Sequence, residues 1–206
     1  MIVVIDSTAL AMLICPEAQA PNDPVTGEQT SHAQARVEKF CRQLEENADI
    51  LMIPTPVLAE VLVRAGPEGS KILESLQGQA FVRVKPFDQA AAIEFAIMTQ
   101  EAIANGHKGG GHSQPWQRVK FDRQIISIAR VSGADKVYSD DDALKNYCGL
   151  VGLDAFSTWD LSVPETVDNL FTVTGVPEQG VPDTSVSHAA PSPKLSSGRK
   201  INLDDD

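Results

Sequence analysis

The sequence predicts an α/β fold with a mainly parallel central sheet, and two observations support this prediction. Short apolar runs of strand length recur along the chain, and amphipathic helical patterns lie between them. Strands that alternate with helices are typical of parallel sheets, because each connection must cross from one end of the sheet to the other. The 206 residues, 42% of them hydrophobic, are enough for one domain with one sizeable core.

The expected strands are short apolar runs. The first is the run IVVI, which ends at Asp6 and is followed by a Ser-Thr pair typical of a polar turn that leads into a helix. Similar runs predict further strands at residues 50–53, 81–84, 136–139 and around 153–156.

The expected helices have one apolar side and recognisable ends. Thr55 and Asp88 are residue types that cap helix N-termini, and Pro56 stands at a first helical position, where proline is favoured. Glycine follows three of the four apolar patterns and indicates where those helices end. These features predict helices at residues 31–46, 56–65, 88–105 and 120–132.

Two polar stretches interrupt the alternation of strands and helices. Residues 16–30 and 106–118 are rich in Pro or Gly and long for connections in a compact domain, so we expect either functional flaps or disordered insertions. From about residue 176, Pro, Ser, Gly, Asp and Thr dominate and apolar residues become sparse. Residues 176–206 are therefore expected to be a disordered tail.

The composition limits the classes of function. The formal charge of −11 argues against a general binder of phosphate backbones, since such affinity comes mostly from Lys and Arg. It is compatible with a nuclease whose site is built from carboxylates that bind cations. The three cysteines are widely separated, so neither a disulfide framework nor a CxxC metal site is expected.

The sequence also predicts a cytoplasmic protein without a membrane span. No apolar stretch approaches the roughly 20 residues that a transmembrane helix requires. The N-terminus opens with an apolar strand and an acid, whereas a secretory signal would begin with a basic segment before a long apolar region.

Several acids are expected at one edge of the sheet. Asp6 ends the first strand, and residues 140–142, all Asp, follow the strand at 136–139. Ligands of open parallel sheets collect at the carboxyl ends of the strands, so these acids are candidates for a binding site. The alternative is structural, because Asp after a strand often caps the next helix.

Two further acids lie within helical patterns. Asp122 precedes Ile125 and Ile126 by three and four residues, which places it on the apolar side of its helix and predicts partial burial. The alternative for Asp122 is stabilisation by the helix dipole in a first turn. Glu60 has Arg64 four residues later, the spacing of an ion pair on a helix surface, and by position alone this alternative is favoured.

Taken together, the four acids indicate a metal site. Carboxylates brought from separate elements to one sheet edge repel one another unless a cation lies between them. Hard divalent cations prefer oxygen ligands, so such a cluster suits Mg²⁺ or Mn²⁺.

Four segments, in this order, resemble the PIN-domain ribonuclease family, which includes the VapC-like toxins of toxin–antitoxin systems. They are VVIDSTAL with Asp6, IPTPVLAEVL with Glu60, KFDRQIISIA with Asp122, and KVYSDDDAL with Ser139 and Asp141. Each segment is short and degenerate, but their order within one α/β chain is fairly specific.

The resemblance covers residues 1–160 and implies a three-layer α/β/α fold for that part, with residues 161–175 as a C-terminal extension. It implies hydrolysis of RNA phosphodiester bonds with Mg²⁺ or Mn²⁺ as the cofactor. It also leads us to expect a separate antitoxin protein and a homodimer as partners.

The resemblance assigns roles to the acids. Asp6, Asp122 and Asp141 are expected to hold the metal, and Glu60 is expected to complete its shell or to orient the attacking water. Asp140 lies one residue out of register with the family pattern and is the alternative to Asp141. All four acids of the matched segments are the expected catalytic residues.

Basic and polar residues near the acids are candidates for substrate binding. Arg118, Lys120 and Arg123 bracket the acid of their helix and are expected to contact the RNA backbone, with Trp116 available to stack on an unpaired base. The alternative is a solvated basic turn with a partly packed Trp. Ser139 is expected to orient a carboxylate or to contact phosphate, although it is equally well explained as a turn residue.

Three other functions are alternatives to a nuclease. A PIN-like module that binds RNA or protein without catalysis would keep the fold, but an intact set of four acids argues against it. An α/β phosphotransfer hydrolase with an Asp nucleophile usually carries a second Asp two residues on, where this chain has Thr8. A dinucleotide-dependent enzyme would need a GxGxxG turn after the first strand, and the sequence has none there.

Overall fold

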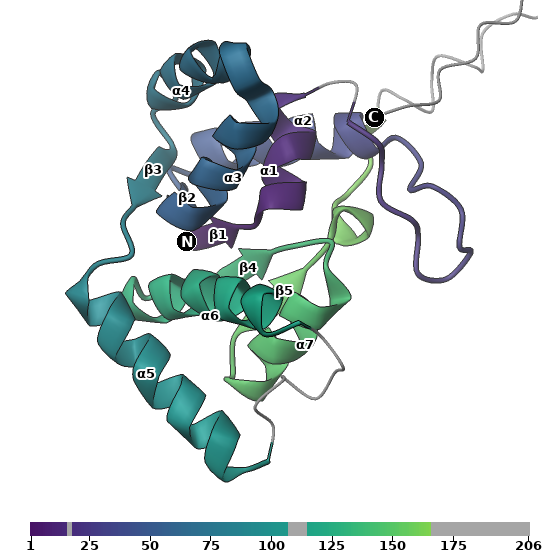
Figure 1. Ribbon diagram of the computed structural model, residues 1–206. Helices are drawn as coiled ribbons and strands as arrows, with labels where there is room; N and C mark the ends of the chain where they lie inside the picture. Colours follow the sequence, from purple (N-terminus) through teal and green to yellow (C-terminus); the bar gives the residue numbers. More distant parts are fainter. Residues whose placement is uncertain (16–17, 107–114, 166–206) are drawn as a thin grey trace, which may run out of the picture. The chain divides into compact units, whose positions relative to one another are not determined.

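The computed structural model describes residues 1–15, 18–106 and 115–165 (Figure 1). Backbone contacts place Met1–Leu170 in one compact unit. The predicted tail at 176–206 lies outside the described residues, and so does most of the Gly-rich loop. Among the residues that are described, no helix is both long enough and apolar enough to cross a membrane.

The centre of the fold is a five-stranded sheet in which every pair of neighbouring strands is parallel. All five strands lie where the apolar runs predicted them, within one residue at each end. The strand order is β3-β2-β1-β4-β5. The strands are β1 (Ile2–Ile5), β2 (Ile50–Pro54), β3 (Val82–Lys85), β4 (Lys136–Tyr138) and β5 (Asp154–Phe156).

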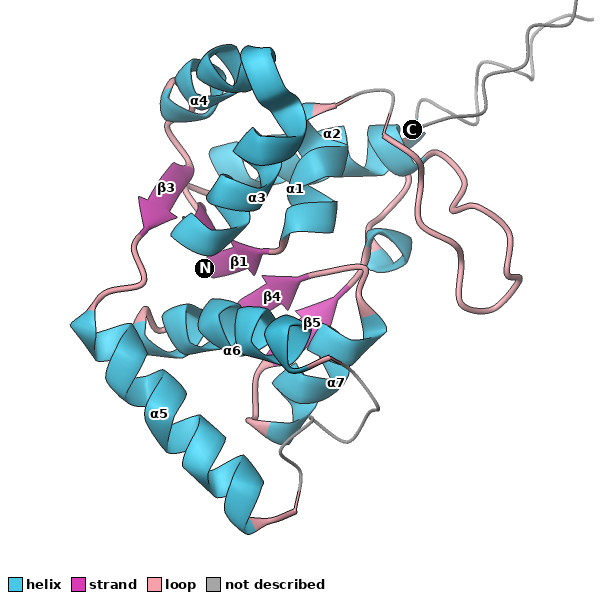
Figure 2. Ribbon diagram, viewed as in Figure 1, coloured by secondary structure: helices cyan, strands magenta, loops and turns pink. Residues whose placement is uncertain are grey.

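Helices connect the strands and cover both faces of the sheet, which makes the three-layer α/β/α arrangement (Figure 2). Right-handed crossovers place the helices between β1 and β3 on one face and those between β3 and β5 on the other. The first group is α1 (Ser7–Ile14), α2 (Ala33–Glu46), α3 (Thr55–Ala65) and α4 (Gly69–Gln77), and the second is α5 (Gln89–Ala104), α6 (Trp116–Val131) and α7 (Asp142–Leu150).

The chain changes direction across β1. It proceeds outward from β1 through β2 to β3, then returns past β1 to β4 and continues to β5. Ligands of open parallel sheets collect at such a switch point, beyond two adjacent strands whose connections leave in opposite directions. The two strands here are β1 and β4, and the residues that directly follow them are Asp6 and Ser139.

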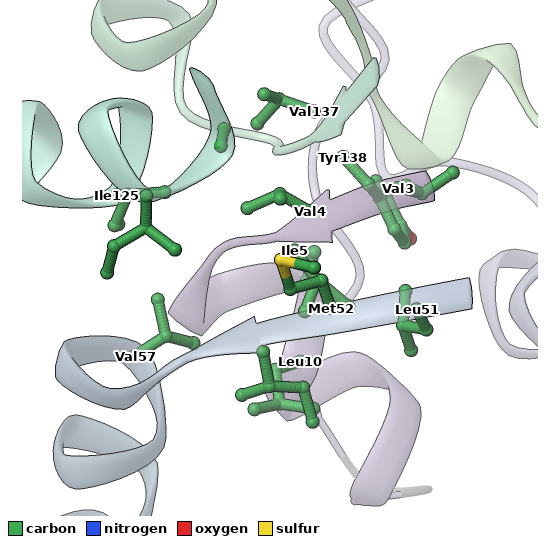
Figure 3. Close-up of a cluster of buried hydrophobic side chains, with 14 of the residues drawn as sticks. Val3, Val4, Ile5, Leu10, Leu51, Met52, Val57, Ile125, Val137 and Tyr138 are labelled. Atoms are coloured by element: carbon green, nitrogen blue, oxygen red, sulfur yellow. The ribbon is translucent and has the colours of Figure 1, made fainter. Parts of the chain in front are cut away.

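The buried strand β1 holds this switch point in place. Val3, Val4 and Ile5 have no exposed surface, and Figure 3 shows them in one apolar cluster with Leu10 of α1 and Val57 of α3. Burying such side chains is worth about 1.5–3 kcal/mol each. The position at which the chain leaves β1 is therefore fixed by the core.

Two predicted helix starts need correction. α6 begins at Trp116 and not at residue 120, so the end of the predicted Gly-rich loop is helical. Thr55 does not cap α3 but is its first residue, and its Oγ1 accepts a hydrogen bond of 3.1 Å from the Phe87 amide. Asp88 caps α5 as predicted, accepting from the Ala91 amide at 3.0 Å.

Two helices were not predicted from the sequence. α4 and α7 each span nine residues, too short for a repeated apolar pattern to stand out. Their apolar residues are nevertheless spaced as one helix face, as in Leu144, Tyr147 and Cys148 of α7, which are all buried. This spacing could have identified α7.

The described part of the first polar stretch is an ordered turn. An antiparallel bridge joins Asn22 to Gln29. Asp23 is buried, and its carboxylate accepts hydrogen bonds from the Val25 amide at 2.7 Å and the Thr26 hydroxyl at 3.0 Å. Residues 18–30 are therefore not a disordered insertion, and a functional role for this turn stays a prediction.

A buried arginine ties α2 to the segment that follows β5. Arg36 donates hydrogen bonds from Nε to the Ser31 carbonyl at 2.9 Å and from Nη1 to the carbonyls of Trp159, at 3.0 Å, and Leu161. Its guanidinium also lies 5.5 Å from the centre of the Trp159 ring. These acceptors compensate a charge that would otherwise be costly to bury.

Phe40 of α2 is expected to be a main contributor to stability. Its ring centre lies 5.6 Å from that of Tyr138 on β4 and 5.7 Å from that of Phe156 on β5. Phe40→Ala should lower the free energy of unfolding by about 3–5 kcal/mol, because it leaves a cavity in this cluster. Urea unfolding measures the change, and a loss below about 1 kcal/mol would contradict the packing described. Val63→Ala, at a side chain that is 81% exposed, is the control and should change stability by less than about 0.5 kcal/mol.

Candidate active site

A cavity of about 420 Å³ lies at the switch point of the sheet. Its walls come from the carboxyl end of β1, the first turn of α1, α3, α6 and the start of α7. The lining of this cavity carries both signs of charge, because carboxylates and two arginines line it together. The acids among its lining residues are Asp6, Glu60, Asp122 and Asp141.

A larger groove, of about 550 Å³, lies between α1, α2 and α4. Its floor is mostly apolar, and it contains none of the residues predicted to be functional. Catalytic chemistry depends on convergent polar groups more than on volume. The smaller cavity at the switch point is therefore the candidate active site.

Asp6 uses both of its carboxylate oxygens for structure. It is 4% exposed; Oδ1 accepts a hydrogen bond from the Ala9 amide at 2.7 Å and so caps α1. Oδ2 accepts a hydrogen bond from the Ser139 hydroxyl. Ser139 Oγ in turn accepts from the Asp141 amide at 3.0 Å. The hydroxyl of Ser139 thus joins the end of β1 to the start of α7.

The two neighbouring acids after β4 have different partners. Asp141 Oδ1 accepts from the Ala143 amide at 2.8 Å and caps α7, while Oδ2 forms an ion pair with Arg118. Asp140 accepts from the amide and the hydroxyl of Thr158, both at 2.7 Å. Asp141 lines the cavity with the other acids and Asp140 does not. Of the two alternatives, the geometry favours Asp141.

Asp122 lies in the second turn of α6, because the helix begins at Trp116. The helix dipole acts mainly within the first turn, so it does not account for this acid. Within the described part of the chain, its carboxylate accepts no hydrogen bond, and Arg118 is the cation that lowers its pKa. Asp122 is the acid of the cavity with the least structural role.

Glu60 forms an ion pair with Arg64, one helical turn later, as the structural alternative predicted. Its side chain is 31% exposed and also lines the cavity. Ion pairs with this much exposure contribute about 0–1 kcal/mol, so the pair does not commit the carboxylate to a purely structural role.

The candidate substrate-binding residues fall into two groups. Arg118 and Lys120 are exposed, and Lys120 lies 5.9 Å from the centre of the half-buried Trp116 ring. Arg123 is fully buried, and its guanidinium lies 5.5 Å from the Trp116 ring centre and 5.2 Å from that of Tyr147. The prediction that Arg123 contacts RNA is therefore corrected, because a side chain enclosed by aromatic rings presents no surface to a substrate.

Burial and mutual repulsion make two of the acids hard to ionise. Burial raises the pKa of Asp6 to about 6, and the hydrogen bond from Ser139 limits this rise. Burial also raises the pKa of Asp122 to about 7, and the nearby charges of Asp141, Asp6 and Glu60 add to the effect. A cation in the cavity would favour the ionised form of both carboxyl groups.

The donor set fits a hydrated hard cation. In residues 1–15, 18–106 and 115–165, no three His, Cys, Asp or Glu side chains form a group that could hold an ion directly. Mg²⁺ usually keeps several waters and takes only one or two carboxylates from the protein, so a closed protein cage is not required. Asp122, whose charge is poorly compensated and whose ligand atoms are oxygens, is the kind of group such a cation stabilises.

The arginines of the cavity were only partly foreseen. The sequence placed Arg118 near Asp122. It did not indicate that Arg118 pairs with Asp141, which follows β4 along the chain, whereas Arg118 precedes β4. No sequence spacing reveals a pair between two such distant elements. The spacing of Glu60 and Arg64 did reveal the other pair.

No family model and no curated protein matches the sequence. The structure of VapBC2 from Rickettsia felis, bound to a DNA fragment from its promoter, matches the fold with a TM-score of 0.50 and 14% identity, over 76% of this chain and 98% of that chain. The chain has a VapC-like PIN fold.

Two further structures match less closely. DNA-bound VapBC from Salmonella typhimurium has a TM-score of 0.48 and 15% identity, over 77% of this chain and 98% of that chain. The sarcin–ricin loop cleaving toxin VapC20 from Mycobacterium tuberculosis has a TM-score of 0.44 and 14% identity, over 73% of this chain and 95% of that chain. At 14% identity, the match to the Rickettsia felis structure describes the fold alone.

The raised pKa of Asp122 predicts that the metal-free protein loses stability as pH rises. The folded protein holds this proton up to a pKa of about 7, whereas the unfolded chain releases it near the model-compound value of 3.8. A folded state that keeps the proton to higher pH than the unfolded chain is favoured at low pH. The contribution of protonated Asp122 to the free energy of unfolding is complete below about pH 4 and is lost as the pH rises through about 7. In EDTA, the loss between about pH 5 and about pH 8 should be smaller in Asp122→Asn by roughly 1–2 kcal/mol, allowing for partial exposure.

Urea unfolding at the two pH values measures this difference. Asp154→Asn, which changes an exposed carboxylate on β5, is the matched control and should keep the native pH dependence. If the native protein and Asp122→Asn lose the same stability, Asp122 is ionised over the whole range and the stated electrostatics of the cavity are wrong.

Proposed function

We propose that this protein is a metal-dependent endoribonuclease that hydrolyses phosphodiester bonds in the cavity at the switch point. One observation carries the proposal: four carboxylates from four separate elements of a PIN fold line a single cavity. Folding brings these like charges together, although burial and, after it, repulsion from the neighbouring acids raise the pKa of Asp122. Arrangements that cost stability in this way are concentrated at functional sites.

Asp6, Asp122 and Asp141 would hold Mg²⁺ or Mn²⁺, directly or through water. When bound, such a cation neutralises charge that develops on the phosphate oxygens and acidifies the attacking water. Ser139 keeps the carboxylate of Asp6 in place, because its hydroxyl donates to Oδ2. Glu60, which also lines the cavity, would complete the shell of the cation or orient the attacking water. As the water attacks phosphorus, the bond to the leaving oxygen breaks and solvent supplies the proton that this oxygen takes up.

RNA is the substrate we propose. Arg118 and Lys120 are exposed cations in the first two turns of the helix that carries Asp122, and they would contact phosphates on either side of the cut bond. The half-buried Trp116 offers part of a ring for stacking on an unpaired base. The net charge of −11 means that affinity depends on these few cations and on the metal, so RNA binding should weaken with salt only with the shallow slope that a small number of phosphate contacts gives.

The proposal includes a partner protein. The Rickettsia felis structure with the same fold is a VapBC2 assembly, and we propose that this chain is likewise the toxin of a toxin–antitoxin pair. A cognate antitoxin would then cover the acidic cavity, and a homodimer of the chain would be the form it binds. The proposal places this activity in the cytoplasm, together with its RNA substrate.

Cleavage of a mixed, structured RNA pool tests the proposed activity. The native protein should cut RNA with Mg²⁺ or Mn²⁺ and lose the activity in EDTA. Asp6→Asn and Asp122→Asn should each reduce the rate at least about 100-fold, because each removes a carboxylate that supports transition-state charge through the cation. Gel analysis of the products over time gives the rates.

Asp154→Asn is the matched control for this experiment and should cut at the native rate, since its carboxylate is exposed on β5 and outside the cavity. Circular dichroism confirms that each variant is folded. If the folded native protein cuts no RNA with either metal, or if the cavity variants cut as fast as the control, the nuclease proposal fails. The alternative, a PIN-like module that binds RNA or protein without catalysis, would then take its place.

A further inference from the structure

The acidic cavity contains its own positive charges. Arg118 and Arg64 both line it, and each forms an ion pair with one of the acids. Arg64 pairs with Glu60 within α3, whereas Arg118 reaches from α6 to Asp141 at the start of α7. The second pair therefore bridges two elements across the cavity.

Arg118 lies among most of the acids of the cavity and not beside one alone. Asp141 raises the pKa of its guanidinium most strongly, and Asp122 and Glu60 raise it further. In return, Arg118 lowers the pKa of Asp122. The positive charge of Arg118 thus acts on the carboxylates that would surround a bound cation.

The pair between Arg118 and Asp141 is well placed to open. The arginine side chain is 54% exposed, and pairs with this exposure are worth about 0–1 kcal/mol. Arg118 also lines a neighbouring cavity of about 440 Å³ together with Thr8 and Asn146. The guanidinium therefore has adjacent space into which it can move without unfolding α6.

We propose that Arg118 is an internal counterion that competes with the divalent cation for Asp141. This inference rests on the proposed function, since it assumes that a cation binds in the cavity. In the metal-free protein, the guanidinium compensates the charge of Asp141, and a divalent cation must displace it. After displacement, the guanidinium lies beside the cavity, where it can contact a phosphate of the substrate.

Titration of the full chain with MnCl₂, without RNA, tests the competition. Free Mn²⁺ is followed by electron paramagnetic resonance for the native protein, Arg118→Gln and Arg118→Lys. Arg118→Gln should bind Mn²⁺ about three- to fivefold more tightly, because breaking a part-exposed pair no longer opposes binding. Arg118→Lys should lie between the two, because lysine keeps the charge but loses the forked geometry that suits a carboxylate.

A matched control separates competition at Asp141 from the general effect of removing a positive charge. Lys145 lies on α7, pairs with Asp142 at 3.0 Å, and lines neither cavity. Lys145→Gln should bind Mn²⁺ within about twofold of the native protein. A gain equal to that of Arg118→Gln would mean that only net charge matters, and it would overturn the proposal.

A double-mutant cycle locates the effect at Asp141. Asp141→Asn should weaken Mn²⁺ binding. Adding Arg118→Gln to this variant should then raise the Mn²⁺ affinity by no more than about twofold, because there is no Asp141 carboxylate left for Arg118 to compete for. A full gain in the Asn background would show that Arg118 acts elsewhere and would contradict the proposal.

The failure of this inference differs from the failure of the proposed function. If the native protein binds Mn²⁺ and Arg118→Gln binds it equally or more weakly, the competition is disproved while the metal site stands. If the folded native protein and Arg118→Gln both bind no Mn²⁺, the metal-dependent function fails and the inference fails with it. Binding by Arg118→Gln alone would be the strongest form of the expected result.

Discussion

The parallel pairing of β1 with β4 is the constraint on which the site depends. Ile5 is in register with Tyr138, and the Asp6 amide donates to the Tyr138 carbonyl at 3.1 Å. Both strands are buried, so their register cannot slip without taking apolar side chains out of the core. Asp6 and Ser139 therefore lie side by side at the ends of the two strands. Their hydrogen bond fixes the position of the Asp6 carboxylate, and the other acids of the cavity lie around it.

The acids of the cavity serve the fold as well as the proposed chemistry. A carboxylate has two oxygens, and in Asp6 and Asp141 one of them caps a helix. The second oxygen faces a hydroxyl in Asp6 and an arginine in Asp141. Asp122 has no such structural partner among the described residues, and it is also the acid whose pKa is raised to about 7. The electrostatic cost of the site is thus concentrated where a bound cation would offset it most.

Arginine has contrasting roles in this protein, and the environment of each side chain decides which. Arg36 is buried and donates to backbone carbonyls, so it holds two segments together. Arg123 is buried among aromatic rings, where its charge is stabilised by their faces. Arg118 is exposed and pairs with an acid across the cavity, which leaves its pairing open to change. The sequence alone treats the last two as equivalent members of one basic cluster.

The amino-acid sequence was enough to predict the parallel α/β class, the five strands and the acids of the sheet edge, because apolar periodicity and strand ends are local properties. It could not choose between Asp140 and Asp141, place the start of α6 at Trp116, or show that Arg123 is enclosed. The roles of the two acids and of Arg123 depend on contacts between residues far apart in the chain: Asp140 is held by Thr158, Asp141 is paired with Arg118, and Arg123 lies against Tyr147. Which carboxylates share a cavity, and which cations already compensate them, is decided only when the helices pack on the sheet.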